Sequence, residues 1–268
     1  FEDSKKFSQQ PDARDPRSYY HYLMALQAEK QYQMEQAALH YKEVVQHDPE
    51  AERFHEKWIR LLLRTGQLDE AVRVGQNAIA RFPENEEIEI ILGDILSSQG
   101  KVEEAIRHYD RASQIHSGNA RAPLLKGSLL EGTGKYDQAL EEYKKGASIE
   151  PNNPLVQFYL GRAFLRANQL QEAEKSLEKA ISLKPNLLQA RHHLAWVLER
   201  QGKTIEALKE YGLLLKLKPG NLSIKNRVSK LHASGSLSPD GAGSAGGIPS
   251  ELEKQPNIHM RIATIYFE

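Results

Sequence analysis

An alanine recurs every 34 residues along most of this 268-residue chain. The six copies stand in register, with no insertion or deletion between them, at Ala37, Ala71, Ala105, Ala139, Ala173 and Ala207. Twelve residues before these alanines stand residues that are small in five of the six copies, and twelve residues after them stands proline, again in five of six. A fixed period of this length predicts a chain built by repetition of one supersecondary unit.

Each unit has the pattern of two helices. In residues 154–187, Leu160, Gly161 and Phe164 lie on one helical face. A second face follows the i, i+4, i+7, i+8 spacing of an amphipathic helix, through Ala173, Leu177, Ala180 and Ile181. The sequence therefore predicts an all-α chain of helical hairpins.

Glycine and proline mark the ends of these helices. A tight turn between the two helices is predicted at Gly66, Gly100, Gly134 and Gly202, with Tyr32 and Asn168 in the two remaining copies. Glycine suits a left-handed turn because it has no Cβ. The proline near position 32 of each unit closes the second helix because it cannot continue one. The small residues at positions 8 and 20 allow the two helices to approach closely, so a leucine there is expected to clash.

These positions resemble the tetratricopeptide repeat, a 34-residue helix–turn–helix family. The resemblance covers six repeats, at residues 18–51, 52–85, 86–119, 120–153, 154–187 and 188–221, and implies a right-handed superhelical solenoid. Repeat 2 departs most from the pattern, with Ile59 at the first small position and Gly75 where other repeats carry tyrosine. Those tyrosines are predicted to pack in the core: Tyr41, Tyr109, Tyr143 and Tyr211.

The resemblance implies a non-catalytic scaffold that holds a peptide or protein segment in a concave groove. In this family the groove is lined mainly by positions 2, 5, 9, 12 and 13 of each repeat. We select ten aromatic or cationic residues at those positions as the candidate groove residues: Phe158, Arg162, Arg166, His192, Trp196, Arg200, Tyr19, Tyr22, Arg60 and Arg64. Aromatic and arginine side chains dominate binding hot spots, which suggests a partner with acidic and apolar side chains.

Two interpretations of the arginines remain open. They could bind partner carboxylates through forked hydrogen bonds, or they could make i,i+4 pairs with glutamates on a solvated helix face. The binding interpretation predicts that Arg162→Glu combined with Arg166→Glu abolishes partner capture without unfolding the array.

One known subclass of the family is excluded by its own motif. Chaperone-tail binders use asparagine at position 9 of two consecutive repeats as part of a carboxylate clamp. Position 9 of this chain contains no asparagine, reading Leu26, Arg60, Asp94, Ser128, Arg162 and Trp196. A carboxylate clamp of that kind is therefore not expected.

The sequence carries no motif for catalysis, a cofactor or a metal. It has no cysteine and no G-x-S-x-G elbow, and its glycine-rich stretch at residues 241–247 lacks the preceding strand that a phosphate-binding loop requires. The ten histidines make no metal-ligand pattern; adjacent His192 and His193 would point about 100° apart on a helix. Lysine plus arginine equals aspartate plus glutamate, at 36 each, so no basic surface for nucleic acid is indicated. No window is long and apolar enough to span a membrane.

The ends of the chain fall outside the six repeats. Residues 1–17 are polar and aperiodic, and are predicted to be a flexible arm. Residues 222–232 resemble a seventh first helix or a cap over repeat 6, and residues 233–255 have linker composition. Residues 256–268 regain a helical face, and are either the start of a further repeat or a segment that docks in a groove. An engineered linker is a third alternative.

We expect a protein-interaction scaffold that is not an enzyme. The repeat register resembles that of bacterial proteins that assemble envelope or secretion machinery, which favours the periplasm or envelope over the cytoplasm. The chain does not begin with methionine, and we expect a longer protein with a start upstream. The alternatives are a regulatory or targeting module of a larger enzyme, and a scaffold that self-associates through its terminal helices.

Overall fold

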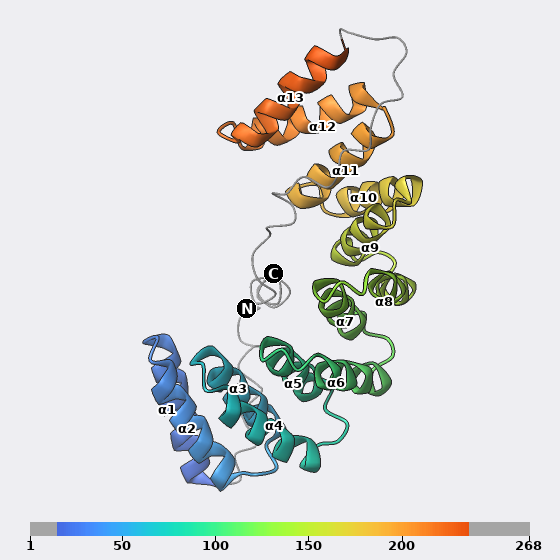
Figure 1. The fold of residues 1–268 in the computed structure, drawn as a ribbon. Coiled ribbons are helices and arrows are strands. Elements are labelled where there is room, and N and C mark those ends of the chain that lie inside the picture. Colours follow the sequence, from blue (N-terminus) through green and yellow to red (C-terminus); the bar gives the residue numbers. More distant parts are fainter. Residues whose placement is uncertain (1–14, 236–268) are drawn as a thin grey trace, which may run out of the picture. The chain divides into compact units, whose positions relative to one another are not determined.

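The computed structural model describes residues 15–235, and within them every regular element is an α-helix (Figure 1). The helices are α1 (Pro16–Lys30), α2 (Met34–His47), α3 (Glu52–Arg64), α4 (Leu68–Arg81), α5 (Glu86–Ser98), α6 (Val102–Ile115), α7 (Arg121–Gly132), α8 (Tyr136–Ile149), α9 (Pro154–Arg166), α10 (Leu170–Leu183), α11 (Leu188–Arg200), α12 (Thr204–Leu217) and α13 (Leu222–Gly235). No described helix is both long and apolar enough to cross a membrane.

The chain divides into two compact units, which we describe separately. Unit 1 ends at His116 and holds α1–α6, and unit 2 begins at Ser117 and holds α7–α13. In each unit every helix packs on the next along the chain. First helices of neighbouring repeats also touch, α3 with α5 in unit 1 and α9 with α11 in unit 2. Each unit is therefore a solenoid of stacked helical hairpins, as the 34-residue period predicts.

The ends of the chain differ in part from the sequence-based prediction. Helix α1 already begins at Pro16, because the Asp15 carboxylate accepts a hydrogen bond of 2.8 Å from the Arg17 amide and caps the helix. The last two residues of the predicted arm are therefore helical. Helix α13 runs on to Gly235, three residues beyond the predicted cap. The rest of the arm, nearly all of the linker and the final segment lie outside the described residues.

The turn inside each repeat has the left-handed backbone that the glycines predict. Gly66, Gly100, Gly134 and Gly202 have φ between 75° and 79°. Tyr32 and Asn168 occupy the same turn with φ of 58°. Asparagine tolerates this region, whereas tyrosine pays a steric cost because its Cβ approaches the following carbonyl oxygen. Tyr32 is also 85% exposed, so its ring gains little from packing in return.

Replacing Tyr32 by glycine should therefore stabilise unit 1. We expect the free energy of unfolding to rise by about 1 kcal/mol, since glycine removes the steric cost and little buried area is lost. Urea unfolding of Tyr32→Gly measures the gain. Gly66→Ala, at the same turn of the next repeat, is the reciprocal control and should destabilise the unit by a similar amount. Equal stability of both variants and the parent chain would contradict the interpretation.

The small residues at position 8 meet the large ones at position 24 of the same repeat. A Cβ on Gly93 would lie 2.6 Å from the Tyr109 ring, and one on Gly127 would lie 2.7 Å from the Tyr143 ring. The core packing predicted for the four tyrosines is confirmed, because none exposes more than 3% of its surface: Tyr41, Tyr109, Tyr143 and Tyr211. The close approach predicted from the small residues is confirmed as well.

In repeat 2 the large residue stands at position 8 and the small one at position 24, the reverse of the usual arrangement. Ile59 stands at position 8 and is completely buried, while Gly75 stands at position 24. The space over Gly75 is filled by Leu92 of the next repeat, whose Cδ2 would lie 2.7 Å from a Cβ on Gly75. The departure of repeat 2 from the pattern is thus a compensated change in packing.

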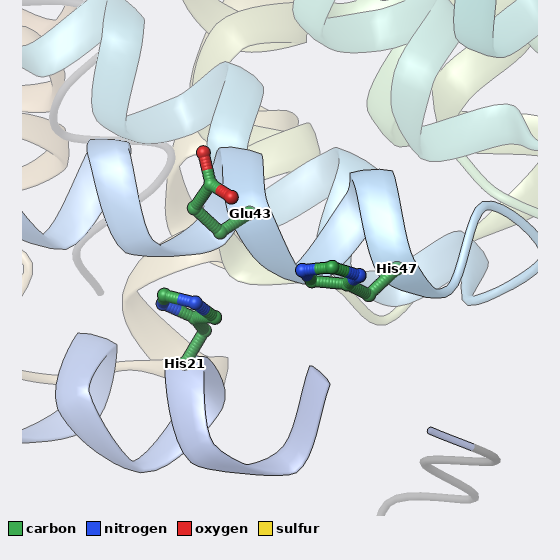
Figure 2. A group of neighbouring side chains, drawn as sticks. All are labelled: His21, Glu43 and His47. Carbon is green, nitrogen blue, oxygen red and sulfur yellow. The ribbon is translucent and has the colours of Figure 1, made fainter. Parts of the chain in front are cut away.

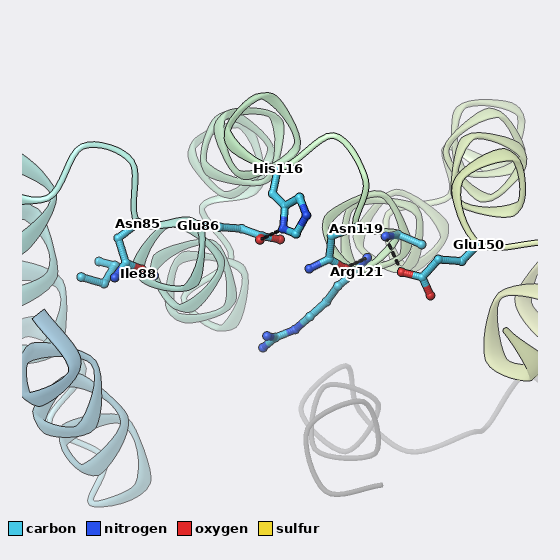
Figure 3. A network of polar contacts seen from close by, with 8 residues as sticks. Asn85, Glu86, Ile88, His116, Asn119, Arg121 and Glu150 are labelled. Carbon is cyan, nitrogen blue, oxygen red and sulfur yellow. Dashed lines mark hydrogen bonds and ion pairs between the residues drawn. The ribbon is translucent and has the colours of Figure 1, made fainter. Parts of the chain in front are cut away.

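Polar contacts at the helix ends cap first helices or join them to the second helix of the same repeat (Figure 3). In unit 1 the Asn85 carboxamide caps α5 by accepting a hydrogen bond of 2.8 Å from the Ile88 amide, and Glu86 lies 3.0 Å from His116 at the end of α6. In unit 2 the Glu150 carboxylate accepts a hydrogen bond of 2.9 Å from the Ala120 amide, just before α7. Each contact fixes the position at which a first helix begins.

Candidate peptide-binding surface

The sequence-predicted groove residues fall in both units, and six of them lie on two neighbouring helices of unit 2. We call these six the arginine surface: Phe158, Arg162 and Arg166 on α9, and His192, Trp196 and Arg200 on α11. Since α9 and α11 are first helices that touch directly, positions 5, 9 and 13 of repeats 5 and 6 come together as the resemblance implies.

Two arginines of this surface share one buried carboxylate on α7. The Nη2 atom of Arg162 donates to Glu131 Oε2 at 2.5 Å, and Nε of Arg166 donates to Glu131 Oε1 at 2.9 Å. The hydroxyl of Tyr143 donates to Glu131 Oε2 at 3.0 Å. Only 3% of the Glu131 side chain is exposed. The carboxylate therefore joins repeats 4 and 5, with two positive charges around one negative charge.

The Arg162 guanidinium is enclosed by aromatic rings. Its Cζ lies 4.8 Å from the centroid of Tyr159 and 5.6 Å from that of Phe158. Burial is the largest influence and opposes its charge, but the charge of Glu131, the two nearby tyrosines and the hydrogen bond to Glu131 together raise the pKa of Arg162, which stays protonated. Burial, and then the charge of Glu131, raises the pKa of Tyr143 as well, so its phenol stays neutral and donates.

These contacts change the interpretation of the arginines. Neither Arg162 nor Arg166 is paired with a glutamate of its own helix; both reach Glu131, 31 and 35 residues earlier in the chain. Arg162 is only 6% exposed. From these contacts, Arg162→Glu is instead expected to destabilise unit 2, because a second carboxylate would be buried against Glu131.

Repeat 6 has a similar layered arrangement. Trp196 is buried, and the Arg200 guanidinium lies over its ring, 5.3 Å from the centroid. Arg200 itself is exposed and donates to the Asn168 side chain at 2.9 Å. His192 is half-buried and lines a pocket of about 240 Å³ with residues of α11, α12 and α13. Phe158, Arg162 and Trp196 thus form a buried layer, and Arg166, His192 and Arg200 are the more accessible members.

The cap helix α13 extends the same polar arrangement. Arg227 donates through Nε to Glu199 Oε2 at 2.8 Å, and Tyr211 donates to the same oxygen at 3.3 Å. Glu199 and Tyr211 stand at the positions of Glu131 and Tyr143, two repeats later. A glutamate at position 12 with a tyrosine twelve residues later is a sequence signal for the glutamate–tyrosine contacts, and these glutamates were not among the predicted groove residues.

The four predicted groove residues of unit 1 do not form a comparable cluster. Tyr19 is 46% exposed, while Tyr22 is half-buried with its ring 5.1 Å from that of Phe54. Arg60 is paired with Glu87 of the next repeat, and Arg64 is exposed at the end of α3. The aromatic and cationic residues of unit 1 therefore lie on separate parts of α1 and α3.

The structure differs from the sequence analysis on the histidines. In repeat 1, His21, Glu43 and His47 offer ligand atoms that all lie within 4.8 Å of one another. Spacing along the chain did not predict this group, because His21 comes from a different helix than the other two. His192 and His193 have rings 6.1 Å apart at 79° to each other, as their adjacent positions predict.

Comparisons with known proteins place the chain in a family. Two family models described as tetratricopeptide repeat match it, one at residues 22–86 and the other at residues 62–129, 96–160 and 130–190. No curated protein matches the chain.

Solved structures share the fold at low sequence identity. PilF of Pseudomonas aeruginosa is 18% identical with a TM-score of 0.65, over 81% of this chain and 99% of that chain. A MamA protein is 21% identical with a TM-score of 0.54, over 63% and 92%. YrrB, described as a TPR protein with an unusual peptide-binding site, is 18% identical with a TM-score of 0.51, over 71% and 95%.

Proposed function

Because this chain belongs to the tetratricopeptide repeat family, we propose that it is a non-catalytic scaffold whose arginine surface binds a peptide or protein segment. The observation that carries the proposal is the charge imbalance at Glu131, where two guanidinium groups meet one buried carboxylate. A carboxylate from a partner would balance the second charge. The likeness in fold to YrrB, described as having a peptide-binding site, supports the same class of function.

The preferred ligand has an acidic side chain next to an apolar one. Arg166 and Arg200 can reach a partner carboxylate, since 23% of the Arg166 side chain is exposed and Arg200 is an exposed residue. Both arginines lie over aromatic rings, Arg166 at 5.0 Å from Tyr136 and Arg200 at 5.3 Å from Trp196. Such stacking holds the guanidinium plane in place, so less side-chain entropy is lost when a carboxylate binds.

Selection of random peptides on the immobilised chain tests this chemistry. We expect the selected peptides to be enriched in aspartate or glutamate beside leucine or phenylalanine. The double variant Arg166→Gln with Arg200→Gln should weaken their binding by about tenfold or more, the size of a hot-spot loss. The matched control is Lys175→Gln with Lys209→Gln, which removes two exposed charges from α10 and α12 of the same unit. Basic or uncharged consensus peptides, or equal losses in both double variants, would contradict the proposal.

A second part of the proposal concerns the larger protein assembly in which the scaffold takes part. The resemblance of its repeat register to bacterial envelope and secretion scaffolds supports a place in such an assembly, in the periplasm or at the envelope. Fractionation of the native source, followed by affinity capture of the full-length protein, tests this. Partners drawn only from the cytoplasm would contradict it.

Self-association is a second candidate function, favoured by apolar side chains on repeat 1. Four large apolar side chains of α1 and α2 are between 46% and 57% exposed: Tyr19, Tyr20, Leu23 and Leu39. An apolar end repeat suits stacking on a second copy of the chain. Light scattering at two protein concentrations should then show a mass that rises with concentration, and Tyr20→Lys with Leu23→Lys should abolish the rise. A monomer at both concentrations would exclude this candidate.

A further inference from the structure

A cluster of metal-binding side chains lies between the two helices of repeat 1, in unit 1 and separate from the arginine surface. His21 projects from α1, and Glu43 and His47 project from α2 toward the same space (Figure 2). One ligand atom from each residue lies within 4.8 Å of the others, and all three residues are half-buried. The rings of His21 and His47 are stacked, with centroids 6.0 Å apart and planes 15° apart.

The repeat fold places these three residues on rigid supports. Glu43 and His47 are four residues apart on α2, so they share one face of that helix. His21 faces them because α1 and α2 pack closely through Ala25 and Ala37, which are both completely buried. Ligands held by packed helices keep their spacing better than ligands on loops.

A third imidazole stands beside the cluster. The Nδ1 atom of His40 lies 3.2 Å from Nδ1 of His21, and the two ring centroids are 5.5 Å apart. His40 is not among the three residues whose ligand atoms all lie within 4.8 Å of one another. Its hydrogen bond to His21 therefore positions the His21 ring beside the cluster, as the outer hydrogen-bond partners of metal-binding histidines do.

The charges around the cluster favour a cation. The groups there are three imidazoles and the Glu43 carboxylate. The Asp15 carboxylate at the start of α1 is within electrostatic reach of His47 but is already paired with Arg17. Neutral imidazole is the form that binds a metal. Imidazole and carboxylate together suit zinc and the other late divalent transition metals.

We propose that repeat 1 binds one divalent transition-metal ion, with zinc as the reference ion, through His21, Glu43 and His47. The bound ion links α1 to α2 and stabilises the first repeat of unit 1, because it binds the folded hairpin and not the separated helices. This proposal does not depend on the peptide-binding function.

Zinc titration of the full chain tests the proposal. The protein is prepared without a histidine tag, stripped with chelator, and titrated with zinc chloride by calorimetry at pH 7.5. We expect saturation at one ion per chain with micromolar or tighter affinity. Affinity should fall steeply at pH 5.5, because protons compete for the imidazoles. Cobalt in place of zinc should give the visible absorption of a tetrahedral complex.

Variants locate the ion. His21→Ala and His47→Ala should each weaken zinc binding by about tenfold or more, and zinc should no longer raise their Tm. The matched control is His116→Ala, because His116 is a histidine of the same unit that also faces a glutamate, Glu86 at 3.0 Å, without a second histidine in its contact. This control should bind zinc like the parent chain.

Two results would overturn the proposal. One is the absence of saturable zinc binding by the parent chain. The other is unchanged affinity in both His21→Ala and His47→Ala, which would place the ion elsewhere. Far-UV circular dichroism with chelator present checks that the variants are folded, and Glu43→Gln, which keeps the shape of the side chain, provides an independent test if an alanine variant unfolds.

Discussion

Glu131→Gln is expected to destabilise unit 2 by about 3–5 kcal/mol, the cost of leaving a buried charge without its counter-charge. The substitution keeps the shape of the side chain but removes the only carboxylate that Arg162 and Arg166 are seen to reach within the described residues. Arg162 is 6% exposed, so water cannot replace the lost charge. The Tyr143 hydroxyl also loses a charged acceptor.

Urea unfolding, monitored by tryptophan fluorescence, measures the loss of stability in unit 2. The chain has two tryptophans, Trp58 in unit 1 and Trp196 in unit 2, so a Trp58→Phe background leaves Trp196 as the only reporter. The control is Glu141→Gln on α8, whose side chain is 64% exposed and pairs with Lys144 one turn away. That change should stay within about 0.5 kcal/mol.

A double variant separates charge from packing. Adding Arg162→Met to Glu131→Gln removes the buried positive charge and keeps an apolar chain of similar length, so part of the lost stability should return. If Glu131→Gln alone costs no more than the surface control, the shared carboxylate is not a structural element. The arginine surface would then be free to act as the sequence first suggested.

Much of the fold could be predicted from the sequence because it repeats. The tight turn was predicted for all six repeats, including Tyr32 and Asn168, where no glycine marks it, and its backbone is left-handed at all six. The buried tyrosines and the close approach at Gly93 and Gly127 were predicted for the same reason. Each position of the repeat occurs six times in the chain, so an unusual residue in one copy does not hide the pattern shown by the others.

Charged contacts between repeats could not be predicted in the same way. Glu131 bonds to residues 31 and 35 positions away on the next first helix, a distance at which neither helical periodicity nor the repeat pattern specifies side-chain pairing. The metal-binding cluster has the same origin, since His21 and His47 belong to different helices of one hairpin. Clusters of polar side chains like these depend on which helix faces pack together. The 34-residue pattern specifies only the turns and the core residues.

Gly127→Leu is expected to destabilise unit 2 by about 3 kcal/mol or more through overpacking. A Cβ at this position would lie 2.7 Å from Cε1 and 2.9 Å from Cδ1 of Tyr143 before the rest of the leucine is added. Tyr143 cannot move aside easily: it is completely buried, its ring stacks on Tyr159 at 5.6 Å, and its hydroxyl donates to Glu131. The substitution therefore disturbs the helix packing and the charged network together.

The same substitution at Gly212 separates this effect from helix propensity. Gly212 also lies inside a helix of unit 2, α12, but a Cβ there would meet nothing within 4 Å. Gly212→Leu should stabilise the unit by about 0.8 kcal/mol, since leucine favours a helix more than glycine does. Opposite signs at the two glycines, measured by the Trp196 signal, would show that close approach to Tyr143 is what requires glycine at position 8. Equal signs would mean that position 8 tolerates a side chain, and that the repeat can widen while its helices stay paired.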